Sequence, residues 1–182
     1  MKYYRILEEF GDKHLCVQTN EKEIVSLTSI NDLVSDYKSL LETSNITGLK
    51  VDEITKDLLK SKQGRTFDLS KLTDDSMNKK GSARIIKPIE PDEMWAEGFG
   101  NRLILTEDQI RESSEDSLIP FQNPNISTLL YKGSNNRLVG PYENIGIRSD
   151  TDKTISEGEI IFVIYKGKFV GISVGNEVAG NL

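Results

Sequence analysis

The first eighty residues combine short β-prone apolar runs with two stretches of helical spacing. Strands are predicted at residues 3–7, 14–18 and 23–27, where β-prone runs are separated by polar turns. Ser29 can cap a helix whose apolar stripe extends from Ile30 to Leu41, and a second short helix is predicted after Asp52. This half of the chain therefore predicts a small α+β unit.

The second half is dominated by β-type patterns. Strands are predicted at residues 83–86, 128–132, 144–148, 159–165 and 169–175, with a turn at 166–168. Residues 159–165 form an unbroken apolar run, which is typical of a strand covered on both faces. Residues 87–95 contain two prolines and predict an extended connection. Thr106 can cap a short acidic helix over residues 107–115, and a turn is predicted at 121–125.

A change of charge divides the 182-residue chain. Residues 1–85 carry 14 basic and 14 acidic side chains, whereas the remainder carries 9 and 15, so the net charge of −6 lies in the second half. Residues 73–82 are polar and without apolar periodicity. We expect a cap at residues 1–82 and a second domain at 83–182, although a surface loop within one domain explains the segment equally well.

Composition excludes several classes of protein. The acidic balance argues against binding of nucleic acid or of an anionic membrane surface. No apolar run approaches the roughly 20 residues of a membrane helix, and the first residues lack a signal-peptide pattern. The single cysteine, Cys16, excludes an intramolecular disulfide and a cysteine-rich zinc site. We expect a cytoplasmic protein, in which His14, the only histidine, is a structural or surface residue.

Three glutamates of the second half are predicted to converge. Glu157 and Glu159 begin a strong strand and point to one face, because side chains alternate along a strand. If the chain turns back at Gly167, Glu177 arrives opposite residue 158, to within one residue. Like charges this close favour a hard divalent cation such as Mg²⁺, Mn²⁺ or Ca²⁺. Three solvated acids at a sheet edge are the alternative.

Several motifs make the second half similar to a known family. The run NNRLVGPYENIGIRSDTDKTISEGEIIFVI, followed by GKFVGISVGNEVAGN, resembles the catalytic domain of the fumarylacetoacetate hydrolase superfamily. Within that superfamily the 2-keto-3-deoxy-arabinonate dehydratases are most similar, and KPIEPDEMWAEG resembles the segment that opens their catalytic domain. The resemblance covers residues 87–182 clearly and the cap loosely. It implies an α+β protein with a small cap followed by a partial mixed β-roll.

The resemblance also implies roles for individual residues. Glu157, Glu159 and Glu177 correspond to the ligands of a divalent metal, expected to be Mg²⁺, with Mn²⁺ or Ca²⁺ as alternatives. Lys132 corresponds to a strand lysine that can hold a substrate carboxylate or stabilise an enolate, and a solvated lysine is equally compatible with the sequence. Arg148 and Ser149 of the RSD motif are expected to contact substrate.

The sequence departs from the family pattern at four positions. Glu177 stands where relatives carry Asp, and Ala179 and Asn181 replace a serine and an arginine. Pro141 stands where relatives carry a histidine. If that histidine is a general base, its role passes to Glu143 or is lost.

Three functions follow from the resemblance. The first is dehydration of a 2-keto-3-deoxy sugar acid through a metal-stabilised enolate. The second is hydrolysis of a carbon–carbon bond in an acylpyruvate-type 2-oxo acid. The third is a noncatalytic fragment or half of a split enzyme, because family members continue beyond Leu182. The expected partners are a small 2-oxo acid and either a second copy of the chain or a complementing C-terminal chain.

Overall fold

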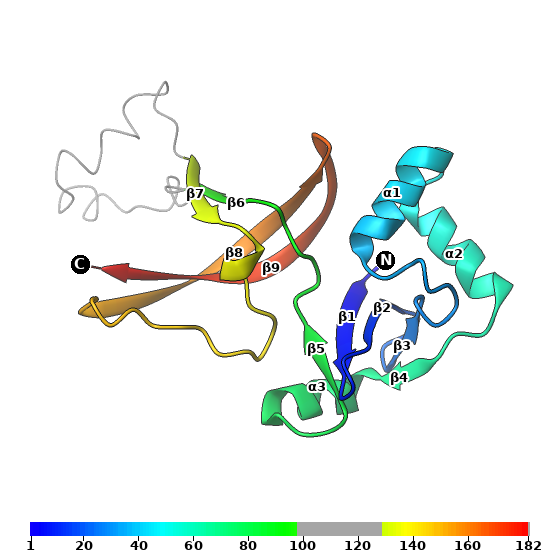
Figure 1. Cartoon of the computed structure of the whole chain (residues 1–182), viewed down its shortest axis with the longest axis horizontal. Helices are drawn as coiled ribbons and strands as arrows, with labels where there is room; N and C mark the ends of the chain where they lie inside the picture. Colours follow the sequence, from blue (N-terminus) through cyan, green and yellow to red (C-terminus); the bar gives the residue numbers. More distant parts are fainter. Residues whose placement is uncertain (98–128, 182) are drawn as a thin grey trace. The chain divides into compact units, whose positions relative to one another are not determined.

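The N-terminal part of the computed structural model is built on a five-stranded antiparallel sheet (Figure 1). Residues 1–97 and 129–181 of the chain are described. Strands occur in the order β4-β3-β2-β1-β5, with bounds β1 Tyr3–Glu8, β2 Lys13–Gln18, β3 Glu23–Ser26, β4 Thr66–Asp68 and β5 Ala83–Ile86. The first three strands lie within one residue of the bounds predicted from the sequence. The short strand β4 was not predicted.

Three helices cover the two faces of this sheet. Helices α1 (Tyr37–Thr47) and α2 (Val51–Ser61) pack on the face that carries Leu15 and Val17. Helix α3 (Leu69–Asn78) packs on the opposite face, where Leu72 joins a cluster that includes Ile6 and Cys16. Successive side chains of β1 and β2 therefore enter two separate apolar layers, as the alternation of a strand requires.

Two predictions about these helices are wrong. The first helix is capped by Asp36, whose side chain accepts a hydrogen bond from the Ser39 amide, and not by Ser29. Ser29 instead donates its hydroxyl to the Ser26 carbonyl and accepts a hydrogen bond from the Arg65 amide, so it braces a loop. Residues 73–78, expected to lack regular structure, lie in α3, which buries only Leu72 and Ser76 and so has little apolar periodicity.

The described residues of the second half, up to Glu97 and again from Leu129, form two antiparallel strand pairs and a single turn of 3-10 helix. Strand β6 (Met94–Glu97) pairs with β7 (Leu129–Gly133), and η1 covers Asn135–Arg137. The long strands β8 (Lys153–Tyr165) and β9 (Lys168–Asn181) form a hairpin. The strand predicted at residues 144–148 is absent, because this segment has no ladder partner. The helix and turn predicted at 107–115 and 121–125 lie outside the described residues.

A two-residue turn sets the register of the long hairpin. Tyr165 pairs with Lys168, and the intervening Lys166 and Gly167 both have positive φ, at 48° and 73°. Positive φ at both central residues is the pattern of a type I′ turn, which matches the twist of the strands it connects. A bulge between Val163 and Ile164 then shifts the ladder by one residue.

Contacts between residues divide the chain into two units, one of which combines two segments that are separate in the sequence. One unit contains Met1–Ile89 and Val139–Leu182, and the other contains Glu90–Leu138. The predicted boundary at residue 82 remains a prediction, but β5 pairs with β1 and so extends the N-terminal sheet to Ile86. Among the helices of the described residues, none is both long enough and apolar enough to cross a membrane.

Candidate metal and substrate site

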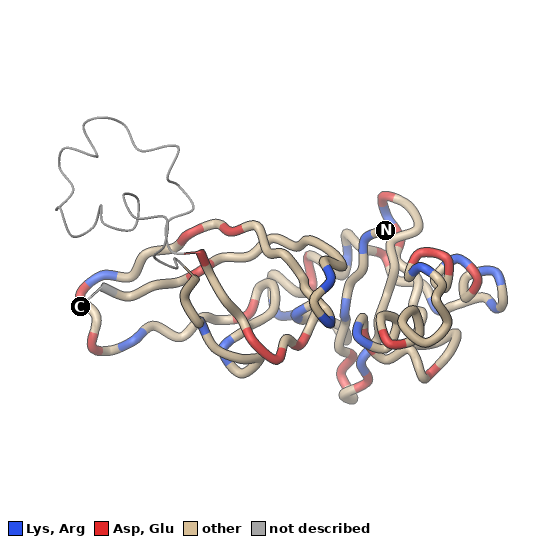
Figure 2. Tube along the Cα trace, turned by 90° about the horizontal axis from the view of Figure 1, so that it is seen from above, with Lys and Arg blue, Asp and Glu red and all other residues tan. Residues whose placement is uncertain are grey.

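The hairpin places the three predicted metal ligands on one face. Glu157 of β8 and Glu177 of β9 are direct cross-strand partners, and Glu159, two residues along β8, is opposite Gly175. The ladder has no bulge between these pairs, so all three side chains leave the same side of the hairpin. Acidic positions along the hairpin are red on the trace in Figure 2. The sequence placed Glu177 opposite residue 158, and the observed partner is one residue away.

Sharing one face of the hairpin does not by itself bring the three carboxylates together at a metal site. Glu157 and Glu159 are exposed and Glu177 is half-buried. Within residues 1–97 and 129–181, no group of three or more acidic, histidine or cysteine side chains could hold a metal ion as placed. The donor set nevertheless suits a hard cation, because carboxylate oxygens are its preferred ligands. The ligand assignment therefore remains a prediction.

Glu143, the predicted base, closes a tight turn that begins at Gly140. Its carboxylate oxygen Oε2 accepts a hydrogen bond from the Gly140 amide at 2.7 Å, and its own amide donates to the Gly140 carbonyl at 3.2 Å. Pro141 and Tyr142 occupy the centre of the turn, and Tyr142 has φ of 64°. A positive φ after proline is typical of a type II turn, where glycine is the usual residue. The turn therefore holds both Glu143 and a strained tyrosine in fixed positions.

Arg148, predicted to bind substrate, is engaged by a neighbour that the sequence reasoning missed. Its Nε and Nη2 atoms donate to the two carboxylate oxygens of Asp150 at 2.8 and 2.5 Å. These hydrogen bonds lower the pKa of the Asp150 carboxyl and raise the pKa of Arg148. Both side chains are exposed, and Ser149 lies between them in the turn. The spacing of an arginine and an aspartate two residues apart was the available signal.

Lys132 lies in the unit formed by Glu90–Leu138, whereas the three glutamates, Glu143 and Arg148 belong to the other unit. It lies in β7 at the irregularity between the Met94 and Trp95 pairs, where its side chain is half-buried. In the same strand pair the rings of Trp95 and Tyr131 lie 5.3 Å apart in an edge-to-face arrangement. The role of Lys132 remains a prediction.

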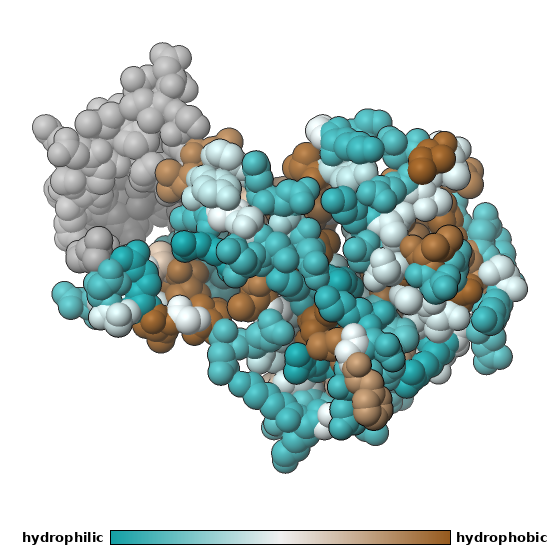
Figure 3. All heavy atoms as spheres, viewed as in Figure 1, coloured by the Kyte–Doolittle hydropathy of each residue, from teal (hydrophilic) through white to brown (hydrophobic). Residues whose placement is uncertain are grey.

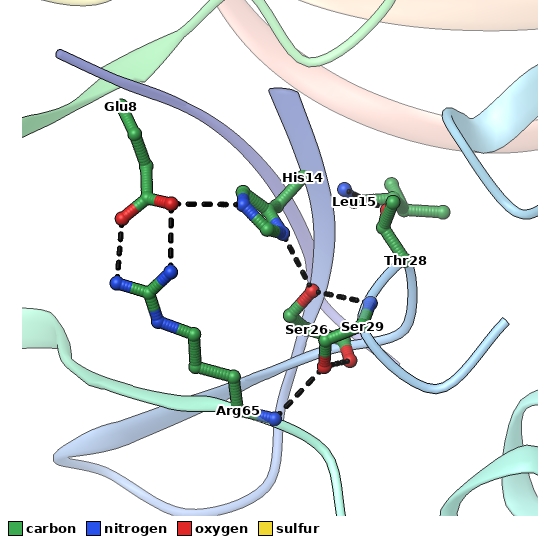
Figure 4. A network of polar contacts seen from close by, with 7 residues as sticks. All are labelled: Glu8, His14, Leu15, Ser26, Thr28, Ser29 and Arg65. Carbon is green, nitrogen blue, oxygen red and sulfur yellow. Dashed lines mark hydrogen bonds and ion pairs between the residues drawn. The ribbon is translucent and has the colours of Figure 1, made fainter. Parts of the chain in front are cut away.

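The N-terminal sheet holds a polar network around His14 (Figure 4). Nε2 of His14 lies 3.1 Å from Glu8 Oε2, and Nδ1 lies 3.0 Å from Ser26 Oγ. Arg65 donates to both oxygens of Glu8, at 2.7 and 2.6 Å. This is the order of groups in a hydrolytic triad, but Ser26 is fully buried and its Oγ accepts the Ser29 amide. A buried hydroxyl cannot meet a substrate, so the network ties strands together, and His14 is structural as expected.

Comparisons with known proteins agree with the sequence resemblance. No protein-family model matches the chain. It is 23% identical over 177 residues to a Haloferax volcanii protein described as "Probable 2-keto-3-deoxyxylonate dehydratase", covering 97% of this chain and 57% of that protein. It is 31% identical over 107 residues to the 2-dehydro-3-deoxy-D-arabinonate dehydratase of Saccharolobus solfataricus, and this match covers 53% of this chain and 34% of that protein.

A solved structure shares the fold. The structure of a 2-keto-3-deoxyarabinonate dehydratase superposes with a TM-score of 0.56 and 18% identity, covering 98% of this chain and 57% of that one. The chain thus covers 57% of the Haloferax volcanii protein and of the solved structure, and its match to the Saccharolobus solfataricus enzyme covers 34% of that protein. The predicted resemblance to 2-keto-3-deoxy sugar acid dehydratases is confirmed. So is an α+β fold with few helices and antiparallel sheets.

Proposed function

We infer that this chain carries the metal-binding part of a 2-keto-3-deoxy sugar acid dehydratase. The observation that supports the proposal most strongly is the shared face of Glu157, Glu159 and Glu177, in a chain similar to a dehydratase over 97% of its length. Under this proposal the β8–β9 hairpin forms part of a β-roll. The substrate is a small 2-oxo acid.

The proposed cation is Mg²⁺, with Mn²⁺ or Ca²⁺ as alternatives. Glu157, Glu159 and Glu177 are the residues that would hold it, since three carboxylates offset the cost of removing its water. A bound cation supplies positive charge that stabilises the negative charge developing on a 2-oxo acid as a proton leaves its C3 atom.

The chain's own residues are proposed to position the substrate and to move the proton. The Gly140 amide fixes Glu143 through Oε2, so Oε1 is the atom assigned to receive the C3 proton. Arg148 uses Nε and Nη2 to hold Asp150, so Nη1 is the donor assigned to a substrate carboxylate, beside the hydroxyl of Ser149. Lys132 is assigned to substrate binding by resemblance alone.

Isothermal titration with Mg²⁺ and Mn²⁺ tests the metal site. Loss of a residue that only supports a metal ligand typically weakens metal binding by roughly 10–100-fold. Because Glu159 is proposed as a direct ligand, we expect Glu159→Ala to weaken binding by at least that factor. Glu42→Ala, which removes one exposed carboxylate from α1, is the matched control and is expected to bind like wild type. Equal affinity in wild type and Glu159→Ala contradicts the assigned ligands.

An assay of the products tests the reaction. The chain is incubated with 2-keto-3-deoxy-arabinonate and saturating Mg²⁺, and formation of 2-oxoglutarate semialdehyde is measured. Metal-dependent formation that is lost in Glu143→Gln supports dehydration with Glu143 as the base. Release of pyruvate from an acylpyruvate, without dehydration of the sugar acid, contradicts the proposal and supports the carbon–carbon hydrolase instead.

A further inference from the structure

Tyr142 adopts a backbone conformation that is unfavourable for its side chain. Within residues 1–97 and 129–181, three non-glycine residues have positive φ: Lys79, Tyr142 and Lys166. A side chain crowds the backbone in this region, so the conformation costs free energy. Tyr142 has φ of 64° at the position of the Gly140–Glu143 turn where glycine is usual. A glycine would avoid this cost, so the tyrosine requires an explanation of its own.

The two lysines differ from Tyr142 because each uses its side chain within the fold. Nζ of Lys79 donates to Asn144 Oδ1 at 2.8 Å. Nζ of Lys166 lies 5.3 Å from the centre of the Tyr165 ring, within the range of a cation–π contact. The Tyr142 hydroxyl has no hydrogen-bond partner in the described part of the chain, and the residue is 44% exposed. Its hydroxyl is therefore available to a ligand.

The surrounding structure holds the turn in place. The Gly140 backbone lies against the chain just after β5, since an added Cβ would be 2.5 Å from the Lys87 amide nitrogen. Glu143 accepts the Gly140 amide through Oε2, and the Lys79 ammonium holds the next residue, Asn144. A strained residue that its neighbours enforce in this way is typical of functional sites. The turn thus presents its central side chain from a fixed backbone.

Exposure by itself identifies no site in this protein. Ile160, Phe162 and Ile164 of β8 are between 61% and 67% exposed, although the unbroken apolar run predicted a strand covered on both faces. Figure 3 shows apolar atoms at the surface over the hairpin. The β-roll proposed above would cover these side chains. Tyr142 is distinguished from them by its backbone conformation and its polar hydroxyl.

Tyr142 is next to residues assigned to the substrate. It directly precedes Glu143, whose Oε1 is assigned to receive the C3 proton, and Arg148 and Ser149 follow in the same segment. A phenol hydroxyl both donates and accepts hydrogen bonds, which suits an alcohol group. The C4 hydroxyl of a 2-keto-3-deoxy-pentonate leaves as water, so the terminal hydroxyl is the one that remains for recognition.

We propose that Tyr142 determines specificity for hydroxylated substrates, its hydroxyl being hydrogen-bonded to the terminal hydroxyl of a 2-keto-3-deoxy sugar acid. This inference rests on the function proposed above. It names the residue that separates a sugar acid from an acylpyruvate, because an acylpyruvate without a terminal hydroxyl gains nothing from this contact.

Titration calorimetry of the full chain with two unreactive acids tests the contact. The first acid, 5-hydroxy-2-oxopentanoate, keeps the terminal hydroxyl, whereas 2-oxopentanoate lacks it. With Mg²⁺ present, wild type is expected to bind the hydroxylated acid roughly 3–10-fold more tightly, as one neutral hydrogen bond provides. Tyr142→Phe is expected to lose this preference and to bind 2-oxopentanoate like wild type. A merely structural role would change both affinities.

Two further variants separate the contact from effects on the fold. Tyr165→Phe is the matched control, because it removes a phenol hydroxyl from a half-buried residue at the hairpin turn, and it is expected to keep the preference. In urea denaturation, Tyr142→Gly is expected to raise the midpoint by relieving the strain, and Tyr142→Phe to leave it unchanged. A lowered midpoint in Tyr142→Gly would show that the fold itself needs the ring, which contradicts the inference.

The binding result is independent of turnover. Neither acid carries the C4 hydroxyl that dehydration removes, so the dehydration assay described above decides the proposed function separately. Equal binding of the two acids by wild type overturns the inference, and so does a preference that survives in Tyr142→Phe. A preference lost in Tyr142→Phe, with no dehydration by wild type, supports the contact and contradicts only the proposed reaction.

Discussion

Glu157 on β8 and Glu177 on β9 are direct cross-strand partners. Their carboxylates therefore share one face of a two-stranded sheet, where like charges in opposed positions reduce stability. Such an arrangement weakens the hairpin when the protein is alone and becomes favourable when a cation lies between the charges. The pairing thus links the strength of the hairpin to occupation of the proposed metal site.

Removal of one charge from this pair is expected to strengthen the hairpin. In metal-free buffer, Glu157→Gln is predicted to slow amide hydrogen exchange in β8 and β9, by an amount equivalent to about 0.2–1 kcal/mol. Glu159→Gln is the control, because Glu159 is opposite Gly175 and is expected to show a smaller change. Faster exchange in Glu157→Gln than in wild type would contradict this account.

Gly140 is predicted to tolerate no side chain. A Cβ atom at this position would lie 2.5 Å from the Lys87 amide nitrogen and 3.0 Å from the Ile86 carbonyl carbon, and these backbone atoms cannot move aside cheaply. We expect Gly140→Ala to lower the free energy of unfolding by about 1–3 kcal/mol in urea denaturation. Gly146→Ala, with nothing within 4 Å of the added atom, is expected to be nearly neutral. Equal effects of the two would show that the close approach at Gly140 does not matter.

The carboxylate of Glu8 is expected to be important for the N-terminal sheet. Its side chain is only 14% exposed and contacts both Arg65 and His14. Glu8→Gln removes the charge but keeps the shape, so it is predicted to lower the free energy of unfolding by about 1–3 kcal/mol. The adjacent exposed Glu9→Gln is the control and should leave the urea midpoint unchanged. Similar midpoints for wild type and Glu8→Gln would contradict the structural role given to the network.

Cys16 is expected to make the protein sensitive to alkali. Burial raises the pKa of the Cys16 thiol to about 12 from an ordinary value of 9.0. Above pH 9 the unfolded chain releases this proton while the folded chain retains it, so stability is complete below that pH and falls as pH rises toward 12. We predict that Cys16→Ala loses less stability than wild type between pH 9 and 10, measured by thermal denaturation. An equal loss would mean that the thiol is accessible in the folded state.

The sequence predicted the strands better than it predicted the helix boundaries. The first three strands are short β-prone runs whose successive side chains enter two apolar layers, so their pattern is strong. The start of the first helix was misplaced because Ser29, although a good cap residue, donates its hydroxyl to the Ser26 carbonyl instead of capping the helix. Helix α3 was missed because it buries only Leu72 and Ser76, too few for a periodic signal.

The candidate site was predictable only where strand geometry determines it. Alternation along a strand and the turn at Gly167 were enough to place Glu157, Glu159 and Glu177 on one side of a hairpin. For Arg148 and Asp150 the spacing of two residues was only a weak signal, because their ion pair depends on the conformation of an irregular turn. The sequence could not show that Glu143 accepts a hydrogen bond from Gly140, for the same reason.

The position of β5 beside β1 determines when the N-terminal sheet can be completed during synthesis. Glu8 is paired with Ala83, so one edge of the sheet must wait until more than eighty residues have left the ribosome. Strands β1, β2 and β3 follow each other through short turns and can pair much earlier, because closing a short loop costs little entropy. The edge of β1 therefore stays open until β5 arrives, and the nascent chain is most exposed to mispairing in that interval.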